Sequence, residues 1–475
     1  MKGGIDMVEM TEKGMKADFI DEALIWELLR SAKSKTESEL DEIIEKGRKA
    51  RGLEPGEAAA LLQNTSPRLE KKLFQAAREV KDAIYGTRIV MFAPLYVSDY
   101  CVNSCKYCGY KCANKFNRRK LTDDEIRREV GIVTGLGHKR IALEAGEDDR
   151  NCPIDYILHA MEVIYDTRPA YGRINRINVN IAATTVENYR KLKQANIGTY
   201  ILFQESYHRE TYREMHPAGP KSDFDYHTTA MDRAMAGGID DVGLGVLFGL
   251  FDYKYEVMGM LLHARHLEEA CGVGPHTLSV PRLRPAGGVT LEQFPYLVGD
   301  ADFKRIVAIL RLAVPYTGMI LSTREEPVFR EEVISIGISQ VSAGSCTGVG
   351  GYQAREDGSG EGQFEVADHR PPDEVLKSLC SQGYIPSFCT ACYRAGRTGD
   401  RFMEFAKSGK IHNLCYPNAI MTFMEYLTDY ADEELKAIGG KVIENNLANI
   451  PSGTMRERTL ERLERIKAGE RNLFF

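Results

Sequence analysis

The feature that most constrains the fold is an alternation of short apolar runs and amphipathic helical stretches that begins near residue 87. Eight runs rich in β-branched and aromatic residues have the length of strands, and each is followed by a stretch long enough for a helix. Because helical crossovers join parallel strands, this pattern predicts a (β/α)₈ TIM-type barrel of the α/β class. The predicted strands are 87–97, 139–147, 174–184, 198–206, 240–250, 276–286, 317–324 and 338–345.

Helical periods between these runs support the same architecture. The clearest are 122–133, 155–166, 186–196 and 302–314, several of which begin with acidic residues, as helix N-termini favour. A Gly-rich loop over 348–363 and a helix over 371–383 would complete the eighth unit. A chain of 475 residues suits two or three domains. We predict an N-terminal helical extension over 1–86, the barrel over 87–385, and a C-terminal helical domain over 386–475.

Charge and cysteine content narrow the class of protein. The net charge of −6 gives no electrostatic reason to expect a nucleic acid or an anionic membrane as partner. No apolar run approaches the roughly 20 residues that span a bilayer, and the N-terminal residues lack a signal-peptide pattern. The eleven cysteines are an odd number and are clustered. We therefore expect a cytoplasmic protein whose cysteines serve metal or redox chemistry rather than disulfides.

Three cysteines lie in the loop after the first predicted strand, within "CVNSCKYC" at Cys101, Cys105 and Cys108. This loop leaves the C-terminal rim of the barrel, where barrel enzymes carry their catalytic residues. A zinc site would need a fourth ligand, for which Cys112 is close in sequence. A [4Fe–4S] cluster held by three thiolates would instead leave one iron open. The C-x3-C-x2-C spacing is unusual for zinc and favours the cluster.

This motif, with the aromatic Tyr107 before its last cysteine, resembles the signature of the radical S-adenosylmethionine (SAM) superfamily. The resemblance implies that the open iron binds the amino and carboxylate groups of SAM. The run "EAGE" at 144–147 ends the second strand and resembles the GGE-type element that contacts the SAM amino group. Here Ala145 stands where many members have Gly, so we expect Ala145, Gly146 and Glu147 to contribute mainly through their backbone. The alternative is an ordinary turn at the end of a strand.

A second cysteine group, Cys389, Cys392 and Cys415, has the spacing C-x2-C-x22-C. From spacing alone, it is a Cys3His zinc site with His412 or an iron–sulfur site. The helix over 371–383 should return the chain to the N-terminal rim, at the opposite mouth from Cys101. Strands of about eight residues would then separate the two groups by on the order of 25 Å. Small residues within several strands, Gly243 among them, suggest a partly open bore between the mouths.

The motifs together resemble the HydG family of hydrogenase maturases over nearly the whole chain. They include PLYVSDYC, NVNIAATT, QESYHRETYREMHP, GPHTLSVPRLRPA and the second cysteine group. The resemblance implies a radical SAM tyrosine lyase: a 5′-deoxyadenosyl radical abstracts hydrogen from L-tyrosine, and Cα–Cβ cleavage yields p-cresol and dehydroglycine. Dehydroglycine then becomes CO and cyanide bound to iron, for assembly of the iron–iron hydrogenase H-cluster.

The same resemblance implies cofactors and partners. Cys101, Cys105 and Cys108 would hold the [4Fe–4S] cluster that binds SAM. The second cysteine group would hold an auxiliary iron–sulfur cluster with an additional labile iron, which carries a free cysteine as ligand. The maturases HydE and HydF are expected to act beside it, and an electron donor such as ferredoxin or flavodoxin to reduce it.

Further site residues are predicted from their places on the strands. His276 opens the sixth strand at the lower mouth, and its imidazole suits the labile iron. Arg324 ends strand seven and could bind the tyrosine carboxylate through two hydrogen bonds, with Ser342 on strand eight adding another. Each could instead make a structural contact at a strand end. Three charged residues that end strands four and six could hold SAM or substrate: Glu205, Arg282 and Arg284.

Two other functions compete with this hypothesis. A radical SAM lyase acting on tyrosine or tryptophan for another cofactor pathway would release dehydroglycine without CO. A scaffold that carries clusters to partner proteins would not cleave SAM.

Overall fold

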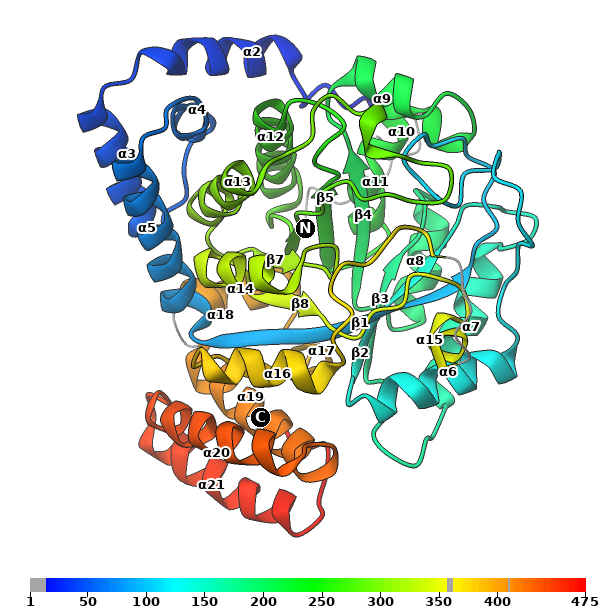
Figure 1. The fold of residues 1–475 in the computed structure, drawn as a ribbon, viewed down its shortest axis with the longest axis vertical. Coiled ribbons are helices and arrows are strands. Elements are labelled where there is room, and N and C mark those ends of the chain that lie inside the picture. The colour runs from blue at the N-terminus through cyan, green and yellow to red at the C-terminus, as the bar shows by residue number, and fades with distance from the viewer. Residues whose placement is uncertain (1–13, 357–361, 409–410) are drawn as a thin grey trace.

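The computed structural model describes residues 14–356, 362–408 and 411–475. The first thirteen residues of the predicted extension, and residues 357–361 of the predicted Gly-rich loop, lie outside the described residues. Eight parallel strands form a closed barrel in the order β2-β3-β4-β5-β6-β7-β8-β1, with β1 also paired to β2 (Figure 1). This confirms the (β/α)₈ barrel predicted from the sequence.

Every predicted barrel strand is present, but all except β1 are shorter than predicted, and β6, β7 and β8 have only three or four residues each. Pro281 contributes to this in β6, because a proline has no N–H to donate to a neighbouring strand. The strands are β1 (Arg88–Ser98), β2 (Arg140–Ala145), β3 (Arg176–Asn180), β4 (Thr199–Glu205), β5 (Asp241–Val246), β6 (Thr277–Ser279), β7 (Gly318–Leu321) and β8 (Gln340–Ser342).

Helices follow the strands and cover the outside of the barrel (Figure 1). α6 illustrates why they begin where they do: Thr122 and Glu125 form a capping box that satisfies two free N–H groups. The helices in and around the barrel are α6 (Asp123–Gly135), α7 (Ile154–Asp166), α8 (Val186–Gln194), α9 (Arg209–Met215), α10 (Phe224–Thr228), α11 (Ala230–Ala236), α12 (Tyr253–Cys271), α13 (Asp300–Ala313), α14 (Pro327–Ile336), α15 (Gly351–Glu356) and α16 (Pro372–Ser381).

Four helices precede the barrel and pack on its outer layer, blue in Figure 1: α2 (Glu22–Ser31), α3 (Glu37–Arg48), α4 (Pro55–Gln63) and α5 (Pro67–Tyr85). α5 lies against α13, and α4 lies against α12. Arg305 of α13 donates hydrogen bonds to the carbonyl oxygens of Leu61 and Leu62, at 3.0 and 3.2 Å. These contacts fix the extension to the outer helices of the barrel, and Tyr85 at the end of α5 reaches the N-terminal mouth.

A ninth strand, β9 (Ile385–Ser387), was not predicted from the sequence. It runs parallel to the first residues of β1, with Arg88 opposite Ile385. It therefore lies at the N-terminal mouth of the barrel. Three helices follow it there: α17 (Ala391–Arg394), α18 (Gly399–Lys407) and α19 (His412–Asp429). α20 (Glu433–Ala448) and α21 (Gly453–Lys467) pack on α19 at the bottom of Figure 1.

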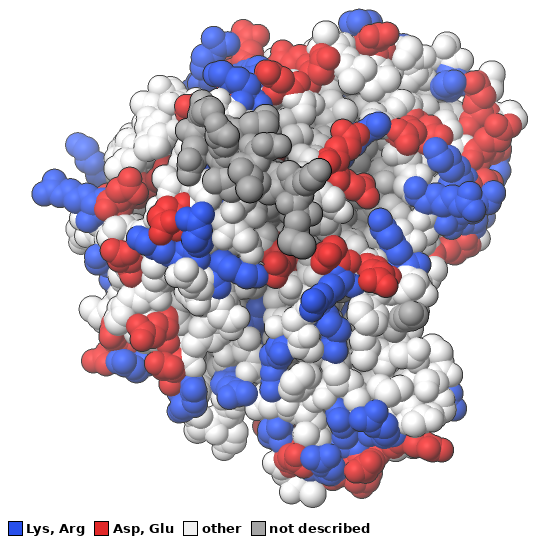
Figure 2. Space-filling view, turned by 180° about the vertical axis from the view of Figure 1, so that it is seen from behind, with Lys and Arg blue, Asp and Glu red and all other residues white. Residues whose placement is uncertain are grey.

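The molecular surface carries both acidic and basic side chains. Acidic and basic side chains are interspersed over the face seen in Figure 2, with uncharged surface between them. Within the described part of the chain, no helix combines the length and the apolar character needed to cross a bilayer.

Candidate active site and metal centres

A cavity of about 210 Å³ opens at the C-terminal ends of the strands. We call it the upper cavity. The loop that follows β1 supplies its three thiols, Cys101, Cys105 and Cys108. The upper cavity is also lined by seven other residues predicted from the sequence: Tyr107, Ala145, Gly146, Glu147, Glu205, Arg324 and Ser342. The SAM-type motif, the EAGE turn and the ends of β4, β7 and β8 thus share one enclosed space.

The cysteine loop is fixed by hydrogen bonds to the EAGE turn. The Val102 N–H donates to the carbonyl of Glu147 at 2.8 Å, and Asn103 Nδ2 donates to Glu147 Oε2 at 2.5 Å. A Cβ on Gly146 would lie 2.3 Å from the carbonyl oxygen of Tyr100, so only glycine allows this close approach. Asn103 Oδ1 also accepts from the Lys221 N–H at 3.0 Å. The loop is therefore held from two sides.

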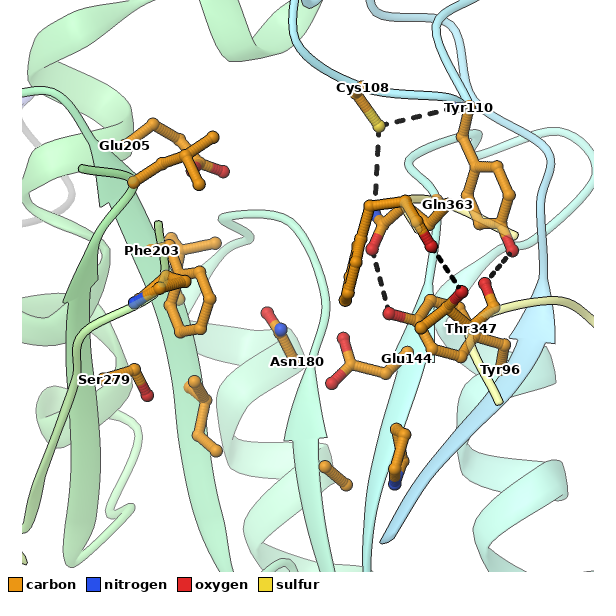
Figure 3. A pocket seen from close by; sticks show the side chains of 18 of the residues that line it. Tyr96, Cys108, Tyr110, Glu144, Asn180, Phe203, Glu205, Ser279, Thr347 and Gln363 are labelled. Carbon is orange, nitrogen blue, oxygen red and sulfur yellow. Dashed lines mark hydrogen bonds between the residues drawn. The ribbon is translucent and has the colours of Figure 1, made fainter. Parts of the chain in front are cut away.

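The thiol of Cys108 is buried and is approached by two hydrogen-bond donors. Tyr110 N–H and Gln363 Nε2 lie 3.4 and 3.8 Å from Cys108 Sγ and point toward it (Figure 3). Burial raises the pKa of Cys108 to about 11, so metal binding would have to displace its proton. Across the described residues, no three Cys, His, Asp or Glu side chains are close enough to share one metal ion.

The fourth ligand of the zinc alternative does not join this group. Cys112 is exposed, its Sγ lies 3.2 Å from Ser104 Oγ, and it does not line the upper cavity. Its position gives no support to a four-cysteine zinc site.

Arg324 is the cation of the upper cavity that lacks an acidic partner. Its guanidinium carbon lies 3.4 Å from the ring centre of Phe364, and burial lowers its pKa. No described carboxylate lies within ion-pair distance of it. Ser342 Oγ accepts a hydrogen bond from the Thr323 N–H at 3.2 Å, which leaves its hydroxyl hydrogen free to donate. Together they offer donors for an anionic group.

Glu205 lies at an irregular end of β4. The pairing of β4 with β5 shifts between Phe203 and Glu205, and Glu205 has φ of 69°, in the left-handed region. Such a bulge turns the side chain that follows it, and it occurs often near functional sites. Lys221 Nζ binds Glu205 Oε1 at 2.8 Å. Tyr107 packs beside this pair and its hydroxyl lies 2.8 Å from His216 Nε2.

The structure does not bring Arg282 and Arg284 into the upper cavity, contrary to the sequence prediction. Arg282 binds Glu325 and donates to Asp300 Oδ1 at 2.7 Å. Arg284 lies 3.9 Å from Glu326. Both residues follow the end of β6, so the alternation of inward and outward side chains no longer decides their direction.

Other lining residues were missed. Glu144 and Asn180 face the upper cavity side by side in Figure 3. Burial raises the pKa of Glu144 to about 8, although a hydrogen bond from Asn180 and the charge of Arg324 oppose the shift. The carboxyl is therefore largely protonated at neutral pH. Its inward position could have been found from the two-residue period of β2, in which Ala142 also faces the cavity.

A second cavity of about 60 Å³ lies at the N-terminal ends of the strands, and we call it the lower cavity. It is lined by Cys389, Cys392, Cys415 and His276, as the chain direction predicted. β9 leads directly to Cys389, α17 carries Cys392, and α19 carries Cys415. His412, the fourth ligand of the zinc alternative, does not line it, and its Nε2 lies 2.8 Å from the carbonyl oxygen of Ala83.

His276 is oriented by its neighbours. Its Nδ1 lies 3.4 Å from Asp241 Oδ1, and its Nε2 lies 3.2 Å from the Tyr393 hydroxyl. Burial lowers the pKa of His276 to about 4, the nearby Asp241 opposing the shift, so the ring is neutral at physiological pH. A carboxylate beside one ring nitrogen is common for a metal-binding histidine, and here the Tyr393 hydroxyl occupies the other nitrogen.

Three arginines that sequence reasoning missed also line the lower cavity: Arg88, Arg140 and Arg176. They are 8, 7 and 2% exposed, and each has one guanidinium nitrogen that pairs with no other described residue. Arg140 Nη2 donates to the Cys389 carbonyl at 2.7 Å. Each begins a strand at the mouth where the second cysteine group was expected, and this position was the signal available. Buried cations without acidic partners favour an anion nearby.

The linings of the two cavities follow one another along the strands but do not overlap. On β2, Arg140 lines the lower cavity and Ala142 lines the upper one, and Val90 and Phe92 divide in the same way on β1. The two cavities share no lining residue among those the structure describes. The structure thus has two cavities with separate linings where the small residues suggested a partly open bore.

Comparison with known proteins shows related chains. The pattern of the radical SAM superfamily matches residues 95–263, and that of the Biotin and Thiamin Synthesis associated domain matches residues 279–385. The chain is 30% identical over 345 residues to the 2-iminoacetate synthase of Salmonella typhimurium, covering 72% of this chain and 89% of the relative.

Two solved structures extend the likeness to nearly the full length. A crystal structure of HydG, a maturase of the [FeFe]-hydrogenase, is 63% identical, covers 97% of this chain and 100% of that chain, and has a TM-score of 0.94. HydG from Carboxydothermus hydrogenoformans, a FeFe-hydrogenase maturase, is 39% identical, covers 95% and 99%, and has a TM-score of 0.83.

Proposed function

This chain belongs to the HydG family of radical SAM maturases of the [FeFe]-hydrogenase, and on that premise we propose that it is a tyrosine lyase. It cleaves L-tyrosine to p-cresol and dehydroglycine, and converts dehydroglycine to CO and cyanide on iron for the H-cluster. The Salmonella relative is named for 2-iminoacetate, which is the carboxylate form of dehydroglycine. One observation carries the proposal: Arg324, a half-buried arginine with no acidic partner among the described residues, faces the same cavity as the three thiols of the SAM-type motif.

The upper cavity would hold both cofactors. Cys101, Cys105 and Cys108 would bind the [4Fe–4S] cluster, and the EAGE turn would hold the amino end of SAM. When bound, these two groups supply a 5′-deoxyadenosyl radical that abstracts hydrogen from the substrate. Glu205 and Tyr107 border this end of the cavity and shield it from water.

Arg324 and Ser342 would hold the substrate. The guanidinium binds the tyrosine carboxylate through two parallel hydrogen bonds, and the Ser342 hydroxyl donates a third. Because Arg324 is enclosed, this charge pair is stronger than it would be in water. Fixing the carboxylate positions the Cα–Cβ bond relative to the source of the radical.

The lower cavity would receive the fragment. Cys389, Cys392 and Cys415 would hold an auxiliary iron–sulfur cluster, while His276 Nε2 and a free cysteine would bind the labile iron that leaves as product. The fragment and cyanide are anions, and the buried guanidinium groups of Arg140 and Arg176 favour their approach. The partners are an electron donor such as ferredoxin or flavodoxin, and the maturases HydE and HydF.

Product analysis tests the proposal. Protein reconstituted without oxygen receives SAM, tyrosine and dithionite, and 5′-deoxyadenosine, p-cresol, CO and cyanide are measured. We expect all four products. Dehydroglycine, or its hydrolysis product glyoxylate, released without CO would favour a lyase of another pathway. An absence of 5′-deoxyadenosine would favour a cluster scaffold instead.

A further inference from the structure

Residues 471–475, Arg-Asn-Leu-Phe-Phe, contact both segments that carry the cysteines of the lower cavity. We infer that this strap clamps the two segments together and so positions Cys389, Cys392 and Cys415 for a cluster. The inference rests on the proposed function for the identity of the bound group. The clamp itself is a statement about the protein, and it can be tested without a cluster.

The first segment is the short stretch from β9 through α17. Arg397 follows α17, and its N–H donates to the carbonyl of Cys392 at 2.8 Å. Its guanidinium donates to the backbone oxygen of Phe475 at 2.5 Å. Arg394 lies over the ring of Phe474, at 3.9 Å from its centre. The strap thus holds this segment at two points.

The second segment is α19, which carries Cys415. Asn418 lies one turn beyond Cys415 and lines the lower cavity itself. Its Oδ1 accepts from the Phe475 N–H at 2.9 Å, and its Nδ2 donates to the Phe475 oxygen at 3.4 Å. Further along α19, Glu425 Oε1 accepts from the Asn472 N–H at 2.8 Å, and Asp429 pairs with Arg471. The strap therefore follows the helix over several turns.

One backbone oxygen joins the two segments, because Phe475 accepts hydrogen bonds from both Arg397 and Asn418. The guanidinium carbon of Arg462 lies 3.6 Å from the centre of the Phe475 ring and helps to fix this residue. α17 has only four residues, too few for a helix that is stable alone. Its position, and hence that of Cys392, needs contacts from elsewhere, and the strap supplies them.

Thiol reactivity in the cluster-free protein tests the clamp. A variant lacking residues 473–475 and the variant Phe474→Ala/Phe475→Ala are compared with wild type under a short pulse of iodoacetamide, and each cysteine is followed by mass spectrometry. Leu460→Ala is the control, since this exposed residue of α21 makes none of the strap contacts. We expect Cys389, Cys392 and Cys415 to react about tenfold faster in the deletion variant, while the upper thiols stay unchanged.

Lower thiols that react as slowly as in wild type would overturn the inference. If the deletion also exposes Cys101, Cys105 and Cys108, the chain has loosened as a whole. The ratio of lower to upper reactivity in Phe474→Ala/Phe475→Ala then decides, and an unchanged ratio counts against the clamp. After reconstitution, the deletion variant should lack the lower cluster by EPR and still form p-cresol. Failure of wild type to form p-cresol would contradict the proposed function, and the reactivity ratio would still judge the clamp.

Discussion

Arg324 differs from Arg282 and Arg284 because no carboxylate of the described residues pairs with it. Replacing it with alanine should raise the tyrosine KM by about 100-fold, since one or two charged hydrogen bonds to the carboxylate are lost. Steady-state p-cresol formation measures this. Arg284→Ala is the matched control, because Arg284 lies outside the upper cavity, and its KM should stay that of wild type. An unchanged KM in Arg324→Ala would remove this residue from the substrate site.

Glu144 makes stability depend on pH. Its folded pKa of about 8 lies above the ordinary carboxyl value because of burial, so the folded state keeps a proton that the unfolded state loses. The stability it contributes is complete below the unfolded pKa and is lost as pH rises through 8. Glu144→Gln cannot titrate. Its stability relative to wild type should therefore rise by about 1.4 kcal/mol per pH unit between pH 5 and pH 8, and then level off.

Unfolding of the cluster-free proteins in urea at several pH values measures this difference. Glu125→Gln is not a suitable control because Glu125 caps α6, whereas the exposed Glu457→Gln within α21 is. A difference between Glu144→Gln and wild type that does not change with pH would show that Glu144 is ionised in the folded state.

For single residues, the sequence predicted correctly that the cysteines of the motif share a cavity, but it did not predict which isolated charged residues would face that cavity. The upper thiols carry their own spacing, so their common cavity could be inferred from local sequence alone. Whether an arginine is free or paired depends on contacts that are distant in sequence. Arg282 binds Glu325, which is 43 residues away, whereas Arg324 has no such partner among the described carboxylates. No local pattern separates the two.

Among the elements, β9 has the greatest consequence for function, because its pairing with the start of β1 places the following residues, Cys389 first, at the lower mouth. Ile385 donates its N–H to the Thr87 carbonyl at 3.0 Å, so Ile385→Pro should remove this hydrogen bond and disturb the pairing with β1. We expect a destabilisation of about 3 kcal/mol and loss of the iron bound at the lower site. The upper cluster and p-cresol formation should remain.

Iron analysis and EPR after reconstitution check this result. Ile385→Val keeps the N–H and most of the buried volume, so it should retain both clusters. Retention of the lower cluster in Ile385→Pro would mean that α19 alone positions the site.

The existence of the eight barrel strands was predictable because their apolar runs are long and regularly spaced. β9 was not, because three residues that include Pro386 carry no recognisable period. The bulge at Glu205 was missed for a related reason: it is set by the pairing of β4 with β5, which a single strand does not encode.

In the whole molecule, the barrel separates two sites while chain direction alone sets which mouth each occupies. That placement followed from the sequence, because a helix after the eighth strand must return the chain to the N-terminal rim. The residues between the sites did not follow from it. Small side chains suggested an open bore, but the structure has charged side chains at this layer, Arg140 and Arg176 among them.

This layer leads to a prediction about how the two sites cooperate. Arg140→Gln/Arg176→Gln replaces two buried cations with smaller, neutral polar side chains, so an anionic fragment gains less from entering the lower cavity. CO and cyanide should fall about tenfold per p-cresol formed, and glyoxylate should rise as dehydroglycine escapes to water and hydrolyses. The exposed Arg168→Gln is the control for loss of positive charge. Parallel measurement of p-cresol, CO, cyanide and glyoxylate gives the ratio. If the ratio of CO and cyanide to p-cresol is unchanged and both clusters are present by EPR, the arginines only balance the negative charge of the lower cluster.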